Sequence, residues 1–73
     1  MSKEKPEVGD VWKNPKNEKV YIIVDVAGSF VGVISKSFFG QDIPKEFLIK
    51  EFAYLGKSKA NINDLFEVEE NDI

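Results

Sequence analysis

The residue types that most often carry out protein chemistry are missing from this 73-residue chain. The sequence contains no Cys and no His, which excludes disulfide bonds, thiolate and imidazole metal ligands, and the common nucleophile–base pairs. The acid–base groups that remain are those of Asp, Glu, Lys and Tyr. We therefore expect no catalytic residues, no metal site and no cofactor, in a protein that is not an enzyme.

Asp25 is the acidic residue with the most unusual surroundings, because it lies within the apolar run from Val20 to Val26. A carboxyl group buried in such a run would be the best candidate for acid–base chemistry. A lone Asp in a strand is more often a hydrogen-bonded structural residue. The other acidic residues match no calcium-loop template, and the scattered glycines form no phosphate-binding loop.

Aromatic residues suggest a different kind of function, the binding of a partner. Trp12 and Tyr54 belong either to the core or to an exposed platform for a peptide or a base. Phe38 and Phe39 are adjacent in a polar loop, and neighbours in extended chain point to opposite sides, so at most one enters a given core. These four residues form the candidate partner-binding site.

The ten positive charges are all lysines. The absence of Arg lowers the expectation of sequence-specific DNA recognition, which relies on bidentate guanidinium contacts. Lysines interleaved with aromatic residues are nevertheless typical of single-stranded nucleic-acid binding. The candidate residues for such a strip are Lys13, Lys16, Lys19 and Lys36. Surface lysines also protect edge strands from aggregation, so the strip has a purely structural alternative.

The net charge of −3 is unevenly distributed. Residues 61–73 contain five acidic residues and no lysine, so residues 1–60 have a small positive excess. The acidic segment is either a solvated tail, or a segment that binds a basic partner or covers the protein's own basic face. We expect a flexible lead over residues 1–7, a single domain over residues 8–69 and an acidic tail over residues 70–73.

No apolar segment in the sequence is long enough for a signal peptide or a membrane span. The sequence also has no glycosylation site of the Asn-x-Ser/Thr type. With the absence of Cys, these features predict a small soluble, acidic, intracellular protein that is cytoplasmic and does not contact a membrane.

The first half of the chain predicts strands over residues 8–13, 19–27 and 30–35. Gly28-Ser29 suits a two-residue type II′ hairpin in which Ala27 faces Phe30. Continued regularly, this register sets Asp25 opposite Gly32 and Val24 opposite Val33. The side chains then expected to face the core are Val20, Ile22, Val24, Val26, Val31 and Val33.

The second half predicts a polar loop over residues 35–42 and a short helix over about residues 44–52. Asp42 is a plausible N-cap of that helix, and Gly56 a plausible C-terminal cap. Residues 53–55 either finish the helix or begin a strand. Residues 65–69 favour a last strand, with a helical turn as the alternative. The chain is thus mainly β (α+β at the margin), with about five strands and one short helix that curl into a small barrel.

Four features resemble small SH3-like barrel proteins encoded by phages and prophages of Gram-positive bacteria. They are the Val8-Gly9-Asp10-Val11-Trp12 strand, the Asn14-Pro15 loop, the Tyr21 to Val26 run and the Phe47…Phe52…Tyr54-Leu55-Gly56 spacing. The resemblance covers roughly residues 8–56. It implies a small SH3-like β-barrel and an accessory protein of uncharacterised role.

Taken together, these observations predict a non-catalytic protein-interaction module that is a monomer or a weak homodimer. An apolar anchor from Phe38 or Phe39 would bind a protein partner. The alternative is a nucleic-acid binding module that uses the four lysines.

Overall fold

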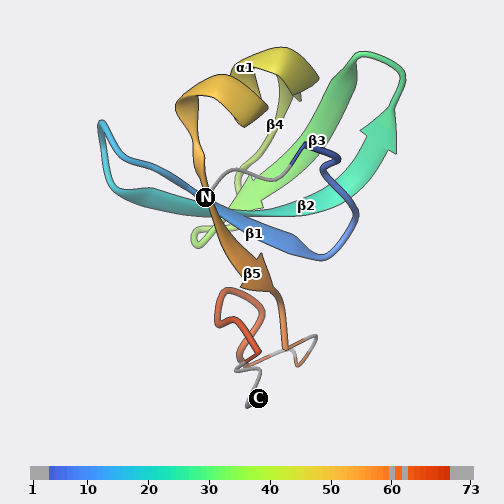
Figure 1. The fold of residues 1–73 in the computed structure, drawn as a ribbon. Coiled ribbons are helices and arrows are strands. Elements are labelled where there is room, and N and C mark those ends of the chain that lie inside the picture. The colour runs from blue at the N-terminus through green and yellow to red at the C-terminus, as the bar shows by residue number, and fades with distance from the viewer. Residues whose placement is uncertain (1–3, 60, 62, 70–73) are drawn as a thin grey trace.

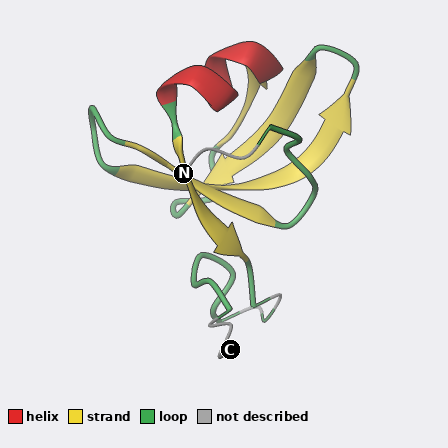
Figure 2. Cartoon of the chain, viewed as in Figure 1, coloured by secondary structure: helices red, strands yellow, loops and turns green. Residues whose placement is uncertain are grey.

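The computed structural model describes residues 4–59, 61 and 63–69, which form a five-stranded antiparallel sheet and one short helix. The strands are β1 (Asp10–Asn14), β2 (Lys19–Ala27), β3 (Phe30–Ser35), β4 (Gly40–Pro44) and β5 (Ala53–Lys57), and the helix is α1 (Lys45–Glu51). Their order in the sheet is β4-β3-β2-β1-β5 (Figures 1 and 2). The mainly-β class and the short helix are confirmed. The sheet is open, so the closed barrel is not confirmed.

The β2–β3 hairpin forms around Gly28 and Ser29, as the sequence predicts. Ala27 pairs with Phe30, and Gly28 has a φ of 58°, which a glycine adopts without strain. The same turn holds the start of α1, because the backbone N–H of Lys45 donates to the carbonyl oxygen of Ser29 at 2.7 Å. The hairpin turn therefore fixes where the helix begins.

A β-bulge at Val24 changes the register expected for the rest of β2. Asp25 pairs with Gly32, but Ile23 pairs with Val33, so Val24 is an extra residue. Because side chains alternate along a strand, the bulge exchanges the two faces of the segment that precedes it. Tyr21 and Ile23 consequently join the main core cluster. The predicted core positions of Val20 and Val24 are wrong, whereas Ile22 is buried as predicted but outside that cluster.

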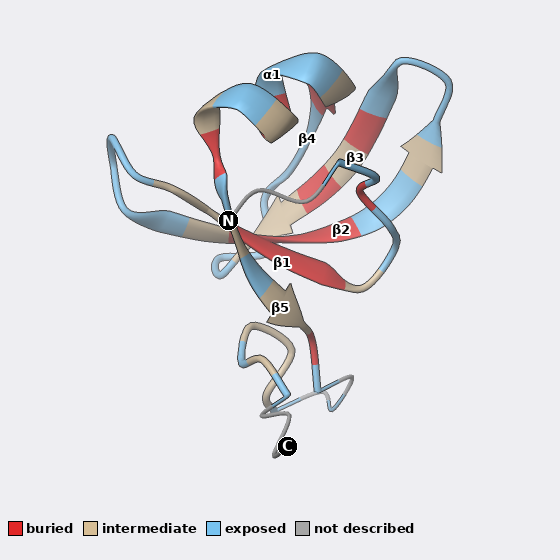
Figure 3. Ribbon diagram, in the orientation of Figure 1, coloured by how far each residue is buried: buried red, intermediate tan, exposed pale blue. Residues whose placement is uncertain are grey.

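The core lies between the sheet and α1, where the helix covers one end of the β3–β4 hairpin (Figures 1 and 3). Its buried side chains are Trp12, Tyr21, Ile23, Val31, Val33, Ile43, Leu48 and Phe52, with Val26 and Tyr54 packed against them. Ile22 is also buried but lies outside this cluster, in a hollow of about 460 Å³ that Val8, Val24 and Leu65 also line. Asp25 is exposed, which overturns its candidacy as a buried acid–base group.

The helix begins and ends differently from the sequence-based expectation. Asp42 is not its N-cap, because β4 continues to Pro44 and Asp42 pairs with Gly32 in the sheet. Gly56 is not its C-terminal cap, since the chain is already extended at Phe52 and continues as β5. Residues 53–55 thus begin a strand rather than finish the helix.

The C-terminal segment forms turns instead of the predicted last strand. Its only ladder contact within the described residues is an isolated bridge between Ser58 and Val68. A β-carbon built onto Gly56 would lie 3.2 Å from the β-carbon of Val68, and Gly56 has a φ of 143°, so both this contact and the backbone favour glycine. The predicted tail, residues 70–73, lies outside the described residues. No helix within the described residues is long and apolar enough to cross a membrane.

Candidate functional site

The turn between β3 and β4 is built by hydrogen bonds to one serine, Ser35. Its carbonyl oxygen accepts from the backbone N–H of Phe38 at 2.8 Å, and its own N–H donates to the carbonyl oxygen of Phe39 at 3.1 Å. The Ser35 hydroxyl lies 3.0 Å from that of Ser37 and accepts from the N–H of Phe39 at 3.3 Å. The turn is therefore an ordered support for the two aromatic residues at its end.

Phe38 and Phe39 are the two most exposed large apolar residues among those described, at 64% and 74% exposure. Neither enters the core. Phe38 has a φ of 61°, in the left-handed region where a side chain with a β-carbon is disfavoured by about 1–2 kcal/mol. Strained backbone at an exposed bulky residue is a feature that clusters at functional sites.

The C-terminal segment supplies a third aromatic ring beside this turn. The ring centroids of Phe66 and Phe38 are 6.3 Å apart, in an edge-to-face arrangement. A hollow of about 400 Å³ lies between the two segments. Its lining residues are Lys36, Phe38, Asn63, Asp64, Leu65, Phe66 and Glu67. We call Lys36, Phe38, Phe39, Asp64 and Phe66 together the Phe38 face.

The C-terminal segment is held in place by hydrogen bonds to the residues that follow β5. The hydroxyl of Ser58 donates to the carbonyl oxygen of Leu65 at 2.6 Å. The backbone N–H of Lys59 donates to the carbonyl oxygen of Glu67 at 3.0 Å, and the two side chains form an ion pair at 3.5 Å. Residues 63–67 of the acidic segment thus lie beside the β3–β4 turn, and Asp64 and Phe66 form part of the Phe38 face.

Two of the four candidate lysines come together beside the Phe38 face. Lys19 and Lys36 line a second hollow, of about 330 Å³, whose other lining residues are Glu18, Val20, Ser35 and Ser37. Lys13 lies on β1 opposite Val20, and Lys16 lies in the β1–β2 turn, so neither lines this hollow. Within the described part of the chain, none of the four lysines forms an ion pair.

Trp12 and Tyr54 do not form an exposed platform. Trp12 is fully buried in the core, with its ring centroid 5.4 Å from that of the half-buried Tyr54. Its assignment as a partner-binding residue is therefore corrected, because β1 is an inner strand of the sheet and directs this ring into the core. Of the four aromatic candidates, the structure exposes Phe38 and Phe39.

Phe66 and Asp64 are surface residues that the sequence analysis did not single out. An alternating pattern over residues 65–69 favoured a strand, which separates neighbours onto two faces. The sequence also contained a spacing compatible with a helical turn, in Ile62, Leu65 and Phe66. That alternative agrees better than the strand with the turns observed over residues 63–66. No pattern in the sequence indicated that this segment would pack beside Phe38.

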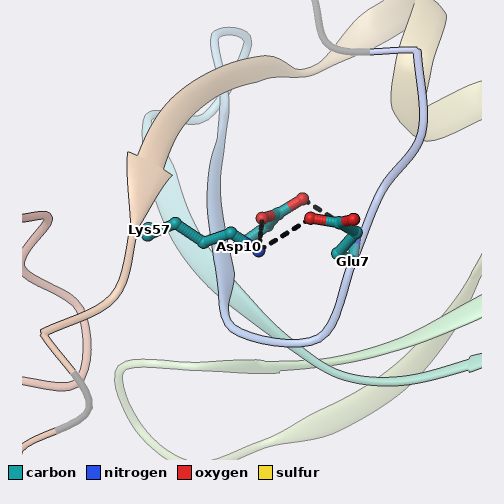
Figure 4. A network of polar contacts seen from close by, with 3 residues as sticks. All are labelled: Glu7, Asp10 and Lys57. Carbon is teal, nitrogen blue, oxygen red and sulfur yellow. Dashed lines mark hydrogen bonds and ion pairs between the residues drawn. The ribbon is translucent and has the colours of Figure 1, made fainter.

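An ion pair between a buried carboxylate and a partly exposed lysine also escaped the sequence analysis. The Asp10 side chain is fully buried and lies 2.8 Å from the Lys57 amine, which also donates to Glu7 at 2.9 Å (Figure 4). The Asp10 carboxylate accepts the backbone N–H of Glu7 at 2.8 Å. Hydrogen bonds to Asp10 and then to Glu7 raise the pKa of Lys57 well above its usual range, against the opposing effect of burial. This network fastens the N-terminal lead to β5.

The described residues contain no group of three or more acidic side chains that could hold a metal ion. The comparisons with known proteins give no relative from which a site could be transferred. No protein-family model, no curated protein and no solved structure matches this chain.

Proposed function

We propose that this chain is a non-catalytic protein-interaction module whose partner contacts the Phe38 face. The observation that carries the proposal is the pair of exposed phenylalanines, Phe38 and Phe39, on an ordered turn with a left-handed Phe38. A bulky apolar residue in such a turn favours neither solubility nor backbone stability. A partner that covers the two rings gives them a role.

The fold that we propose for this module is an SH3-like barrel left open. Its support is the order of the strands, a four-stranded meander whose first strand also pairs with the last, and the short helix before that last strand. The resemblance to phage and prophage barrels supports an accessory role in such a genome, in which the partner is a host or phage protein.

The proposed function is tested by affinity capture from nuclease-treated lysate of the source organism. We expect the wild-type chain to retain a specific protein and Phe39→Ser to lose it. Phe30→Ser is the matched control, because Phe30 is a half-exposed phenylalanine at the opposite end of β3. Equal retention by all three forms would refute the role of this face.

Nucleic-acid binding is the second candidate, and two lysines that form no ion pair within the described residues favour it. Lys19 and Lys36 line one hollow, and Lys36 also lines a hollow with the aromatic Phe38. Binding of a labelled single-stranded oligonucleotide would weaken steeply with salt, because lysine–phosphate contacts release counterions. The double variant Lys19→Glu/Lys36→Glu would then lose binding at low salt. A protein complex through Phe39 would show little of this salt dependence.

A further inference from the structure

Charges of both signs lie beside the aromatic rings of the Phe38 face. Lys36 lines both hollows, Lys19 lines only the first, and Asp64 lines only the second, together with Phe38 and Phe66. The second hollow therefore brings one basic side chain, Lys36, and one acidic side chain, Asp64, together with two aromatic rings. A partner that matches this face must present an acidic group to Lys36, a basic group to Asp64 and an apolar surface to the rings.

The unpaired state of these charges makes the arrangement available to a partner. Lys36 and Asp64 line the same hollow, yet within the described residues neither forms an ion pair with the other or with any third residue. Phe39 is 74% exposed and contacts no other aromatic ring in the part of the chain described. The face thus combines exposed apolar surface with a positive and a negative side chain that are not paired within the described residues.

A surface that carries a positive and a negative side chain beside aromatic rings is complementary to itself. In a symmetric dimer a two-fold axis brings the same patch of both subunits together, with the two copies running in opposite directions. An axis that passes between Lys36 and Asp64 at the second hollow would place Lys36 of each copy opposite Asp64 of the other, with the aromatic rings in the same interface. Each charge contact would then occur twice in the interface.

We propose that the Phe38 face binds a second copy of this chain, as a two-fold symmetric homodimer with Lys36 of each subunit paired to Asp64 of the other. This inference rests on the proposed function and names the partner. A small domain also gains more than a large one from burying additional apolar surface, because its own core is limited. The exposed aromatic turn supplies such surface.

The test is a charge-exchange experiment followed by sedimentation equilibrium from low micromolar to millimolar concentration. We expect the wild-type chain to shift from 8.3 kDa toward twice that mass. Lys36→Glu alone and Asp64→Lys alone should each raise the dimer dissociation constant about tenfold, because each change turns two attractive contacts into repulsive ones. An equimolar mixture of the two variants should regain the wild-type affinity, since both contacts are attractive in the mixed dimer.

Two further variants separate the contributions of charge and of aromatic surface. Phe39→Ser should abolish the dimer, and Phe30→Ser, at the other end of β3, should leave it unchanged. Far-ultraviolet circular dichroism of each variant checks that the domain is folded. Because Lys36 and Asp64 are surface residues outside the core, all charge variants should give the wild-type spectrum.

A wild-type chain that remains monomeric over the whole range overturns the proposal, as does a mixture of the two variants that stays monomeric. These results leave the proposed function intact if Phe39→Ser still loses the protein captured from lysate, because the face then binds a different partner. If Phe39→Ser changes neither the dimer nor the capture, both proposals fail. An oligonucleotide that binds through Lys36 and prevents dimerisation would assign the face to nucleic acid.

Discussion

Two non-glycine residues of the described chain have a positive φ, Phe38 at 61° and Glu18 at 60°. Glu18 lies in the exposed β1–β2 turn, where its backbone N–H donates to the carbonyl oxygen of Asn14 at 2.7 Å. Tight turns often require this conformation, and glycine adopts it most easily. Glu18 is therefore strained by the local geometry of a turn, whereas Phe38 combines the same strain with an exposed ring.

The strain at Glu18 predicts a stabilising substitution. Glu18→Gly should raise the free energy of unfolding by about 0.5 kcal/mol, because removing the β-carbon relieves more energy than the added flexibility of the unfolded chain costs. Urea unfolding measures the change. Lys16→Gly, in the same turn but without a positive φ, is the control and should be neutral or destabilising. A destabilised Glu18→Gly protein would contradict this account.

The Asp10–Lys57 pair predicts a pH dependence of stability. The pKa of Lys57 is higher in the folded than in the unfolded chain, so the folded state holds this proton more tightly. The stabilisation is complete below the ordinary lysine pKa of about 10.4 and is lost as the pH rises through the folded-state value. Unfolding at a series of alkaline pH values should show a decline in wild type that is smaller in Lys57→Met. Lys16→Met, without an ion pair in the described structure, should decline like wild type.

Removing the carboxylate itself has a larger effect near neutral pH. Asp10→Ala leaves the Glu7 N–H and the Lys57 amine without their shared acceptor. We expect the free energy of unfolding to fall by about 1.5–3 kcal/mol, the range for hydrogen bonds to a charged group. Glu7→Ala removes the exposed contact to Lys57 and should cost less than about 1 kcal/mol. Thermal unfolding of both variants side by side measures the two losses of stability. A smaller loss for Asp10→Ala than for Glu7→Ala would contradict this account.

At the scale of elements, the bulge in β2 decides which side chains reach the core. Val24 is 48% exposed, and Val33 is almost fully buried although a regular ladder would have paired the two. Val24→Asp should therefore lower the free energy of unfolding by less than about 1 kcal/mol. Val33→Asp buries an unpaired charge and should leave the domain unfolded. Loss of the native circular dichroism spectrum in Val24→Asp would instead support the regular register, in which Val24 faces the core.

Strand and helix positions followed from the sequence wherever local chemistry determined them. Gly28-Ser29 determines a hairpin by turn geometry alone, and Leu48 and Phe52 determine a helix by their spacing. The bulge at Val24 could not be predicted, because both regular and bulged registers pair apolar residues with apolar residues across β2 and β3. Where both faces of a strand are apolar, alternation no longer distinguishes inside from outside.

Only those residues of the candidate site that are neighbours in the sequence could be predicted from it. Phe38 and Phe39 stand out as two aromatic residues in a polar loop, which a single sequence shows directly. The contribution of Asp64 and Phe66 depends on contacts across the chain, since Phe66 meets Phe38 from 28 positions away in the sequence. Trp12 was ambiguous because large aromatics serve both cores and interfaces, and only its strand's place inside the sheet decides between them.

At the scale of the whole molecule, dimerisation links stability to concentration. A domain that folds into a dimer gains stability by mass action, so its melting temperature rises with protein concentration. Calorimetry over the micromolar to millimolar range should show this rise for the wild-type chain. Phe39→Ser, which should abolish the dimer, should melt at a nearly constant temperature over the same range. A wild-type melting temperature that does not depend on concentration would contradict the dimer.

The bulge at Val24 also has an evolutionary consequence. One extra residue in β2 lets Tyr21 and Ile23 on one side of it and Val26 on the other reach the same core, although they differ in odd and even position. Removal of that residue would leave a regular ladder with the same side chains on the core side. Deletion at position 24 is therefore the single-residue deletion that β2 should tolerate best. A relative with a regular strand would align to this chain with a gap at Val24, and ungapped matching would superimpose core positions on surface positions over half of β2.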